Sequence, residues 1–231
     1  GKGVELMTPD FGRVLTAMIS PFTTDDELDV EGAKTLAKWL VEQGNEGLVI
    51  AGTTGESPTL THEEQINLIA AVVEAVDVPV IAGAGSNDTK TAVELTERCT
   101  EVGASGILTV TPYYNRPSQQ GLLEHFSAIA KSTNLPVMLY DIPARSGRKI
   151  DTSTILQLAD EVENIVALKD AAGDVAETAR LIAAAPEGFE VYSGEDSLTL
   201  SLLSVGAVGT VSVASHWSTP ETSEMIKSFF A

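Results

Sequence analysis

Cysteines and basic residues are scarce in this chain of 231 residues. The single cysteine, Cys99, excludes an intramolecular disulfide and is typical of a reducing compartment. Fourteen lysines and arginines stand against 33 aspartates and glutamates, so the formal net charge is -19 at pH 7. We expect no binding to nucleic acid, because contact with a phosphate backbone needs clustered cationic side chains. An anionic substrate would need a local cationic site.

Long apolar runs and metal-binding patterns are also missing. No apolar run reaches the roughly 20 residues that cross a bilayer, and Gly1 opens no secretory signal. We therefore expect a cytoplasmic protein without membrane contact. His62, His125 and His216 lack the spacing of metal ligands, and Asp88 stands where a dinucleotide fingerprint has its third glycine. We expect neither a metal nor an organic cofactor.

Eight short apolar runs alternate with amphipathic stretches. The apolar runs are Val14–Ile19, Gly47–Ala51, Val78–Ala82, Gly106–Val110, Val137–Tyr140, Ile165–Leu168, Phe189–Tyr192 and Val208–Val213. The helical patterns are Val30–Gln43, His62–Val76, Thr89–Val102, Gln119–Ser132, Thr152–Asp160, Asp174–Ala184, Asp196–Val205 and Thr219–Phe230. This alternation predicts an α/β protein with a parallel sheet, and eight units are typical of a (β/α)8 TIM barrel. We expect one domain over residues 1–231. A doubly wound open sheet is the alternative, because periodicity does not prove closure.

Polar residues follow these strands, at the end where a barrel carries its active site. Lys169 comes directly after the apolar run Ile165–Leu168, and Arg145 lies in the segment after Val137–Tyr140. Burial disfavours a charged lysine, so its pKa falls and the neutral amine can form a Schiff base with a keto acid. Taken singly, these residues have ordinary interpretations, namely a solvated loop lysine and a surface arginine.

Five motifs together carry a family resemblance. They are GTTGESPTLTHEE (52–64), TPYYNRPSQQGLLEHF (111–126), LYDIPARSG (139–147), ALKDAAGD (167–174) and YSGED (192–196). In this order and spacing they resemble the dihydrodipicolinate synthases, Schiff-base-forming barrels of the N-acetylneuraminate lyase superfamily. The resemblance implies a lyase that condenses pyruvate with L-aspartate 4-semialdehyde to 4-hydroxy-tetrahydrodipicolinate, on the route to diaminopimelate and lysine.

The resemblance also implies roles for the catalytic residues. Lys169 matches the Schiff-base lysine, which binds pyruvate covalently, and Tyr140 matches the tyrosine that relays protons at the imine. Thr53 matches the hydroxyl that links this tyrosine to a second one. Tyr114 matches the second tyrosine, which in this family reaches in from a neighbouring subunit. A homo-oligomer, a tetramer in the family, is therefore expected.

The family's substrate contacts carry over in the same way. Thr54 matches the residue that binds the pyruvate carboxylate, and Arg145 matches the residue that receives the semialdehyde carboxylate. Val211 matches an apolar backbone contact near the imine. Sialic acid and keto-sugar-acid lyases of the superfamily are the alternative, but a polyol substrate has less use for the guanidinium of Arg145. Those lyases also usually carry serine at the position of Thr53.

Two departures from the family pattern matter. His62 matches one histidine of the family's lysine-feedback site, but Gln65 and Thr91 replace its second histidine and its glutamate, and Pro58 replaces a smaller residue. Losing the carboxylate removes the partner of an ammonium group, so we predict weak or absent inhibition by lysine.

The second departure concerns the end of the chain: the family continues past the eighth unit into a C-terminal helical domain, and we expect this extension to be absent here. A barrel scaffold without activity is therefore a further alternative to an enzyme. A non-enzymatic binder would be expected to lose Lys169 or Tyr140, and both are present.

Overall fold

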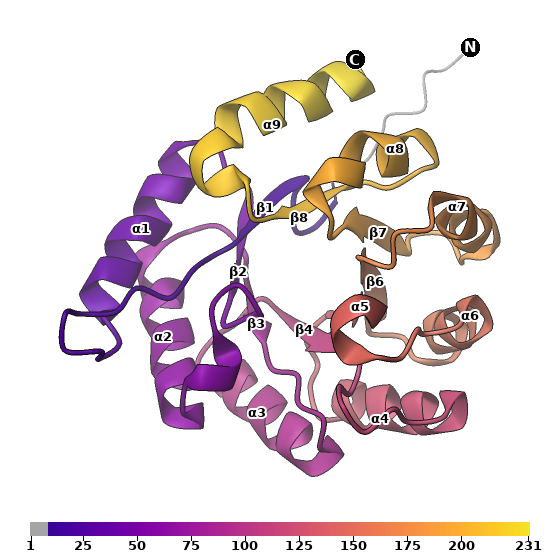
Figure 1. Cartoon of the computed structure of the whole chain (residues 1–231), viewed down its shortest axis with the longest axis horizontal. Coiled ribbons are helices and arrows are strands. Elements are labelled where there is room, and N and C mark those ends of the chain that lie inside the picture. The colour runs from indigo at the N-terminus through magenta and orange to yellow at the C-terminus, as the bar shows by residue number, and fades with distance from the viewer. Residues whose placement is uncertain (1–8) are drawn as a thin grey trace.

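The computed structural model describes residues 9–231 and contains a closed barrel of parallel strands. The strands follow chain order, and β1 pairs with β8, which closes the ring (Figure 1). Their bounds are β1 Val14–Ala17, β2 Gly47–Ile50, β3 Val80–Gly83, β4 Gly106–Val110, β5 Val137–Asp141, β6 Ile165–Asp170, β7 Glu190–Ser193 and β8 Gly209–Ser212. The predicted (β/α)8 barrel is confirmed, and the open-sheet alternative is wrong. Gly1, at which we expected no secretory signal, lies outside the described residues.

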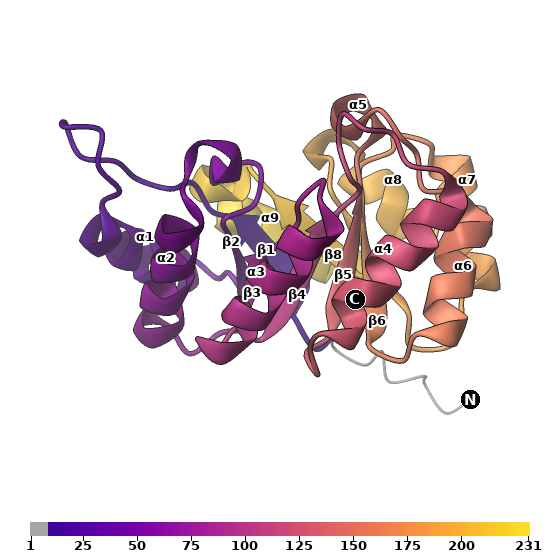
Figure 2. The same cartoon turned by 90° about the horizontal axis from the view of Figure 1, so that it is seen from below.

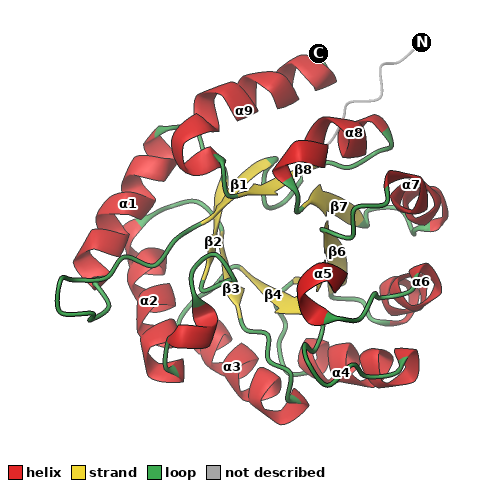
Figure 3. Ribbon diagram, in the orientation of Figure 1, coloured by secondary structure: helices red, strands yellow, loops and turns green. Residues whose placement is uncertain are grey.

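Helices form a ring around the strands (Figure 3). Their bounds are α1 Val30–Glu42, α2 His62–Ala75, α3 Thr89–Glu101, α4 Gln119–Lys131, α5 Pro143–Ser146, α6 Thr152–Glu161, α7 Val175–Ala184, α8 Thr199–Ser204 and α9 Ser215–Phe230, with 3-10 turns at Ser57–Thr59 and Asp196–Leu198. Side-chain caps fix several helix starts, and α2 begins with a full capping box between Thr61 and Glu64. No helix among residues 9–231 combines the length and the apolar character that a membrane span requires.

The two faces of the strands pack into two different apolar layers. Residues that point into the barrel, such as Leu15, Met138 and Tyr192, form one apolar cluster. Residues that point outward, such as Leu48, Leu139 and Leu168, form a larger cluster with the helices. Successive side chains of a strand point to opposite faces, so neighbours in sequence contribute to different layers. This alternation decides which residue of each strand can reach a ligand in the barrel mouth.

Several element ends differ from the sequence-based prediction. Strand β6 continues two residues past Leu168, because Lys169 and Asp170 pair with both neighbouring strands. The last helix begins at Ser215 instead of Thr219, with a kink at Ser218. The short helix α5 was not predicted, and it lies over the barrel mouth on the upper edge in Figure 2.

Candidate active site

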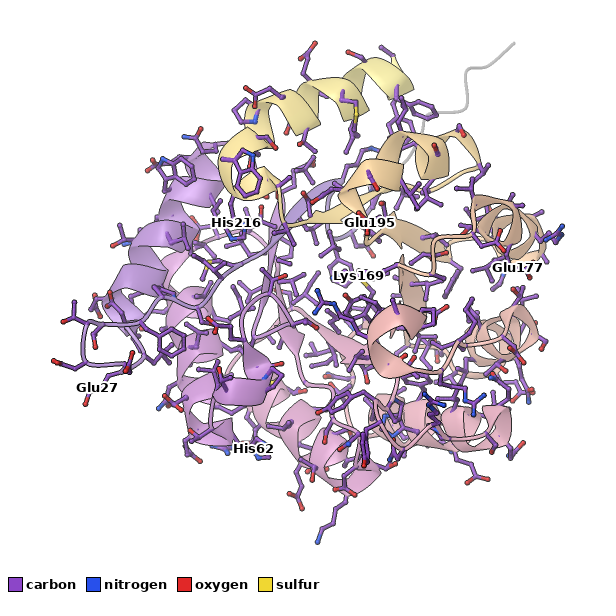
Figure 4. The ribbon with its side chains drawn as sticks, viewed as in Figure 1. Glu27, His62, Lys169, Glu177, Glu195 and His216 are labelled. Carbon is purple, nitrogen blue, oxygen red and sulfur yellow. The ribbon has the colours of Figure 1, made fainter. Side chains whose placement is uncertain are left out.

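Lys169 lies within strand β6 instead of in a loop after it. Its partners in register are Tyr140 of β5 and Tyr192 of β7. The side chain is inside the barrel, near the centre of the ring in Figure 4, and the residue is only 6% exposed. No salt bridge holds its ammonium group within the described part of the chain. A buried lysine without a carboxylate partner is unusual, which makes Lys169 a candidate for a catalytic role.

Burial changes the acid–base chemistry of Lys169. It lowers the pKa of the amine to about 8, with the charge of Asp196 acting in the opposite direction and that of Arg145 adding to the decrease. The Nζ atom lies 4.0 Å from the centroid of the Tyr140 ring. Gly194 makes room for the lysine, since a Cβ atom there would lie 3.0 Å from Cγ of Lys169. A neutral amine near physiological pH can act as a nucleophile.

Tyr140, the penultimate residue of β5, lies beside Lys169. Burial raises the pKa of its phenol, and Arg145 and a hydrogen bond with Thr53 reduce this increase. The phenol therefore keeps its proton at neutral pH. It can give the proton to a reacting group and regain it through the hydroxyl of Thr53.

Two adjoining cavities lie beside Tyr140 and the segment that follows it. A small cavity of about 30 Å³ is lined by Thr53, Tyr140 and Val110, among others. A wider one of about 390 Å³ shares Thr53 and Val110 and is bounded by Arg145 of α5. Their common walls make a path from the barrel interior to an exposed guanidinium. The structure thus brings four predicted residues, Lys169, Tyr140, Thr53 and Arg145, to one mouth.

The remaining predicted residues lie in different surroundings. Thr54 is half-buried in the turn after β2, next to Thr53. Val211 of β8 is buried and belongs to the cluster inside the barrel. Tyr114 is 92% exposed, has a positive φ of 75°, and donates its backbone N–H to the carbonyl of Ser146. Within one chain, Tyr114 therefore stays at the surface.

Sequence reasoning did not assign roles to the acidic residues at the mouth. Glu195 and Asp196 follow β7, and their charges act on Tyr140 and Lys169 respectively. Asp196 also accepts the N–H groups of Val213 and Ala214 after β8. Their position after a predicted strand was the available signal. Among residues 9–231, no group of three or more His, Cys, Asp or Glu side chains is arranged for a metal ion.

The positions that matter for lysine inhibition lie at the starts of α2 and α3. His62 opens α2 at the edge of the molecule (Figure 4). Gln65 is buried and donates its amide N–H to the carbonyl of Ser57 at 2.9 Å. Thr91 bonds through its backbone and its hydroxyl to Asp88. Pro58 lines the wider cavity.

Known proteins resemble this chain in both sequence and fold. The sequence profile of the dihydrodipicolinate synthetase family matches residues 10–231. A 4-hydroxy-tetrahydrodipicolinate synthase from Moorella thermoacetica is 51% identical over 96% of this chain and 76% of its own length. The crystal structure of a dihydrodipicolinate synthase from Bacillus anthracis has a TM-score of 0.94 at 49% identity, covering 96% of this chain and 77% of that one. The lysine-bound enzyme from Cyanidioschyzon merolae has a TM-score of 0.95 at 47% identity, covering 96% and 76%.

Proposed function

This chain belongs to the dihydrodipicolinate synthetase family and is a lyase, and we propose that it condenses pyruvate with L-aspartate 4-semialdehyde through a Schiff base on Lys169. The observation that carries the proposal is the buried amine of Lys169, with its lowered pKa, beside the protonated phenol of Tyr140. A nucleophile and a proton donor within reach of each other are what imine formation requires.

The chemistry begins at the keto group of pyruvate. The neutral Nζ of Lys169 adds to the keto carbon, and Tyr140 protonates the departing oxygen, so water leaves and a protonated imine forms. The imine withdraws electrons from the adjacent methyl group. Loss of a methyl proton gives an enamine, whose carbon attacks the aldehyde carbon of the second substrate while that oxygen gains a proton.

Release of the product needs no further reagent. The amino group of the bound semialdehyde adds to the imine carbon and displaces Nζ of Lys169, which closes the six-membered ring. The overall reaction gives 4-hydroxy-tetrahydrodipicolinate and one water. Proton transfers run between Tyr140, Thr53 and solvent, and Tyr114 of a neighbouring subunit completes this relay in the proposal. The reaction uses no metal and no organic cofactor.

The substrate carboxylates are recognised by different groups. Thr54 and the backbone N–H groups of its turn hold the carboxylate of pyruvate, as glycine-rich turns do for anions. Val211 provides an apolar contact near the imine. Arg145 receives the carboxylate of the semialdehyde, because a guanidinium can bind a carboxylate with two hydrogen bonds. The exposed cation at the wider cavity favours this substrate over the polyols of the related sialic acid and sugar-acid lyases.

The wider setting of the enzyme follows from the same proposal. The single domain of residues 1–231 works as a homo-oligomer in the cytoplasm, and the tetramer of the family is the expected form. The high exposure of Tyr114 within a single chain supports assembly of subunits. The use of two small metabolites and the single cysteine support the cytoplasmic location.

Borohydride trapping tests the Schiff base directly. The protein is incubated with pyruvate, reduced, and analysed by intact mass and peptide mapping. We expect one reduced pyruvyl adduct, located on Lys169, and none in the Lys169→Ala variant. The exposed Lys90 provides the matched control, since Lys90→Ala should keep the full adduct. A folded wild-type protein without adduct, or with adduct on another lysine, would refute the proposal.

A further inference from the structure

The segment of residues 142–150, here called the mouth lobe, is closed at its base by one buried carboxylate. Asp141, the last residue of β5, is 0% exposed and precedes the lobe. Its Oδ1 atom accepts the N–H of Ile150 at 3.1 Å, and its Oδ2 atom accepts a hydrogen bond from Nζ of Lys149. The same Nζ donates to the carbonyl of Ile150 at 2.6 Å. Both ends of the lobe therefore meet at Asp141.

The contacts that hold the lobe to the rest of the chain are polar: Gln119 donates its amide N–H to the carbonyl of Lys149 at 3.0 Å, and Arg148 donates to the carbonyl of Arg116. Its helix α5 has four residues and ends at Gly147 in the left-handed conformation. The hydroxyl of Ser146 bonds to the backbone of its near neighbour Arg148. Ile150 is fully buried, but Ala144 and Arg145 at the top are exposed. A short excursion with few apolar contacts depends on its polar anchors for a defined position.

The lobe carries the groups that face the second substrate. Ile142, Arg145 and Ser146 form one side of the cavity of about 390 Å³. The carbonyl of Ser146 also accepts the backbone N–H of Tyr114. A displacement at the base of the lobe would therefore move the guanidinium of Arg145, while Lys169 and Tyr140 lie in strands outside the lobe.

The Asp141–Lys149 pair itself lies on the other side of the strand. Tyr140 points into the barrel, so Asp141, the next residue, points outward toward the helices. Lys149 lines an outer cavity with Asp151 and Glu177 instead of the barrel mouth. The strand thus separates the pair from the proposed pyruvate site. In sequence, however, Asp141 directly follows Tyr140, and Lys149 lies four residues after Arg145.

We propose that the Asp141–Lys149 ion pair is a positioning device for the reaction, which fixes the mouth lobe so that Arg145 meets the carboxylate of the second substrate. This inference rests on the proposed function and assigns a specificity role to two residues outside the cavity. Its expected effect is selective, because the lobe supplies the side chain that binds the carboxylate of the semialdehyde and none that binds pyruvate. Formation of the pyruvate adduct on Lys169 does not depend on the pair.

The Lys149→Met variant tests this selectivity. We expect the KM for aspartate semialdehyde to rise about ten- to hundredfold, since displacement of a binding group by about 1 Å has effects of this size. The KM for pyruvate and the rate of borohydride-trapped adduct should stay within about twofold, because the imine site is untouched. Lys149→Arg keeps a cation and should restore most of the affinity. Lys90→Met, which breaks an exposed pair with Glu94, is the matched control.

A folding defect can be separated from the predicted effect. Burial raises the pKa of Asp141, and Lys149 opposes that increase, so the carboxyl can take up a proton when Lys149 is removed. If Lys149→Met does not fold, the double variant Asp141→Asn with Lys149→Met removes the contact without leaving a buried charge unpaired, and it serves instead. It should show the same selective rise in KM.

Arg145→Ala, measured in parallel, separates this inference from the proposed function. If Arg145→Ala leaves the KM for the semialdehyde unchanged, the substrate assignment of Arg145 fails. If Arg145→Ala raises this KM but the Lys149 variants do not, the positioning role of the ion pair is wrong. Equal increases in the KM of both substrates would also contradict it, because they would indicate a general structural effect.

Discussion

At the scale of single residues, the charge of Lys169 controls when this site can react. With a pKa of about 8, roughly one amine in ten is neutral at pH 7, against fewer than about one in 1,000 for an ordinary lysine. We expect the rate of adduct formation to rise with pH and to level off above about 8. In Asp196→Asn the midpoint should move to lower pH, because the negative charge that raises the pKa of Lys169 is removed. The measurement is the initial rate of borohydride-trapped adduct across pH.

The structure offers a matched control for the Asp196 substitution. The Asp196 carboxylate accepts N–H groups from Val213 and Ala214, and an asparagine carbonyl can accept them as well, so the loop should keep its place. Asp25 is an exposed acid in the loop between β1 and α1, and Asp25→Asn should leave the profile unchanged. An upward shift in Asp196→Asn, or equal shifts in both variants, would show that the charge of Asp196 does not act on Lys169.

At the scale of elements, the order of strands and helices could be predicted, but not all their ends. The alternation of apolar and amphipathic segments predicted the barrel, because parallel strands that are covered by helices have to be apolar and the helices that cover them amphipathic. It missed the end of β6, because Lys169 and Asp170 are polar and the strand is extended there only by pairing with β5 and β7. It missed α5, since four residues starting at a proline are too short to show helical periodicity.

The same limit applies to the candidate site. The motifs predicted Lys169, Tyr140, Thr53 and Arg145, and the barrel topology brings these residues to one mouth. Contacts between distant segments could not be predicted, because they depend on register and on side-chain direction. The approach of Gly194 to Lys169 and the reach of Lys149 to Asp141 are of this kind.

The starts of α2 and α3 determine the expected response to lysine. Gln65 is already bonded to the carbonyl of Ser57, and Thr91 offers no carboxylate to an ammonium group. We therefore expect millimolar lysine to leave the activity almost unchanged. The variant Gln65→His with Thr91→Glu should gain inhibition, measured as the lysine concentration that halves the initial rate.

The control for this prediction adds the same charge elsewhere. Thr35 is exposed on α1, and Thr35→Glu should not create inhibition. Strong inhibition of the wild-type protein by lysine would contradict the prediction. In that case Gln65 and Thr91 would have to bind lysine without an acidic partner.

At the scale of the whole molecule, the fold leaves one proposed catalytic group exposed at the surface. The barrel brings Lys169, Tyr140 and Thr53 together, but Tyr114 stays 92% exposed on the loop after β4. Its neighbour Tyr113 is also exposed, although it lines the wider cavity. A surface tyrosine can serve a buried site only if another copy of the chain supplies it, so activity should depend on assembly.

Mixing two inactive variants tests this exchange between subunits. Lys169→Ala lacks the nucleophile, and Tyr114→Phe lacks the hydroxyl, so each variant alone should be nearly inactive. In a hybrid dimer, the site that keeps Lys169 receives the intact Tyr114 of its partner. Half of the randomly formed dimers are hybrids with one complete site each, so about a quarter of the wild-type activity should return. Activity that does not recover, after hybrid formation is verified by native mass spectrometry, would mean that Tyr114 acts within its own chain or not at all.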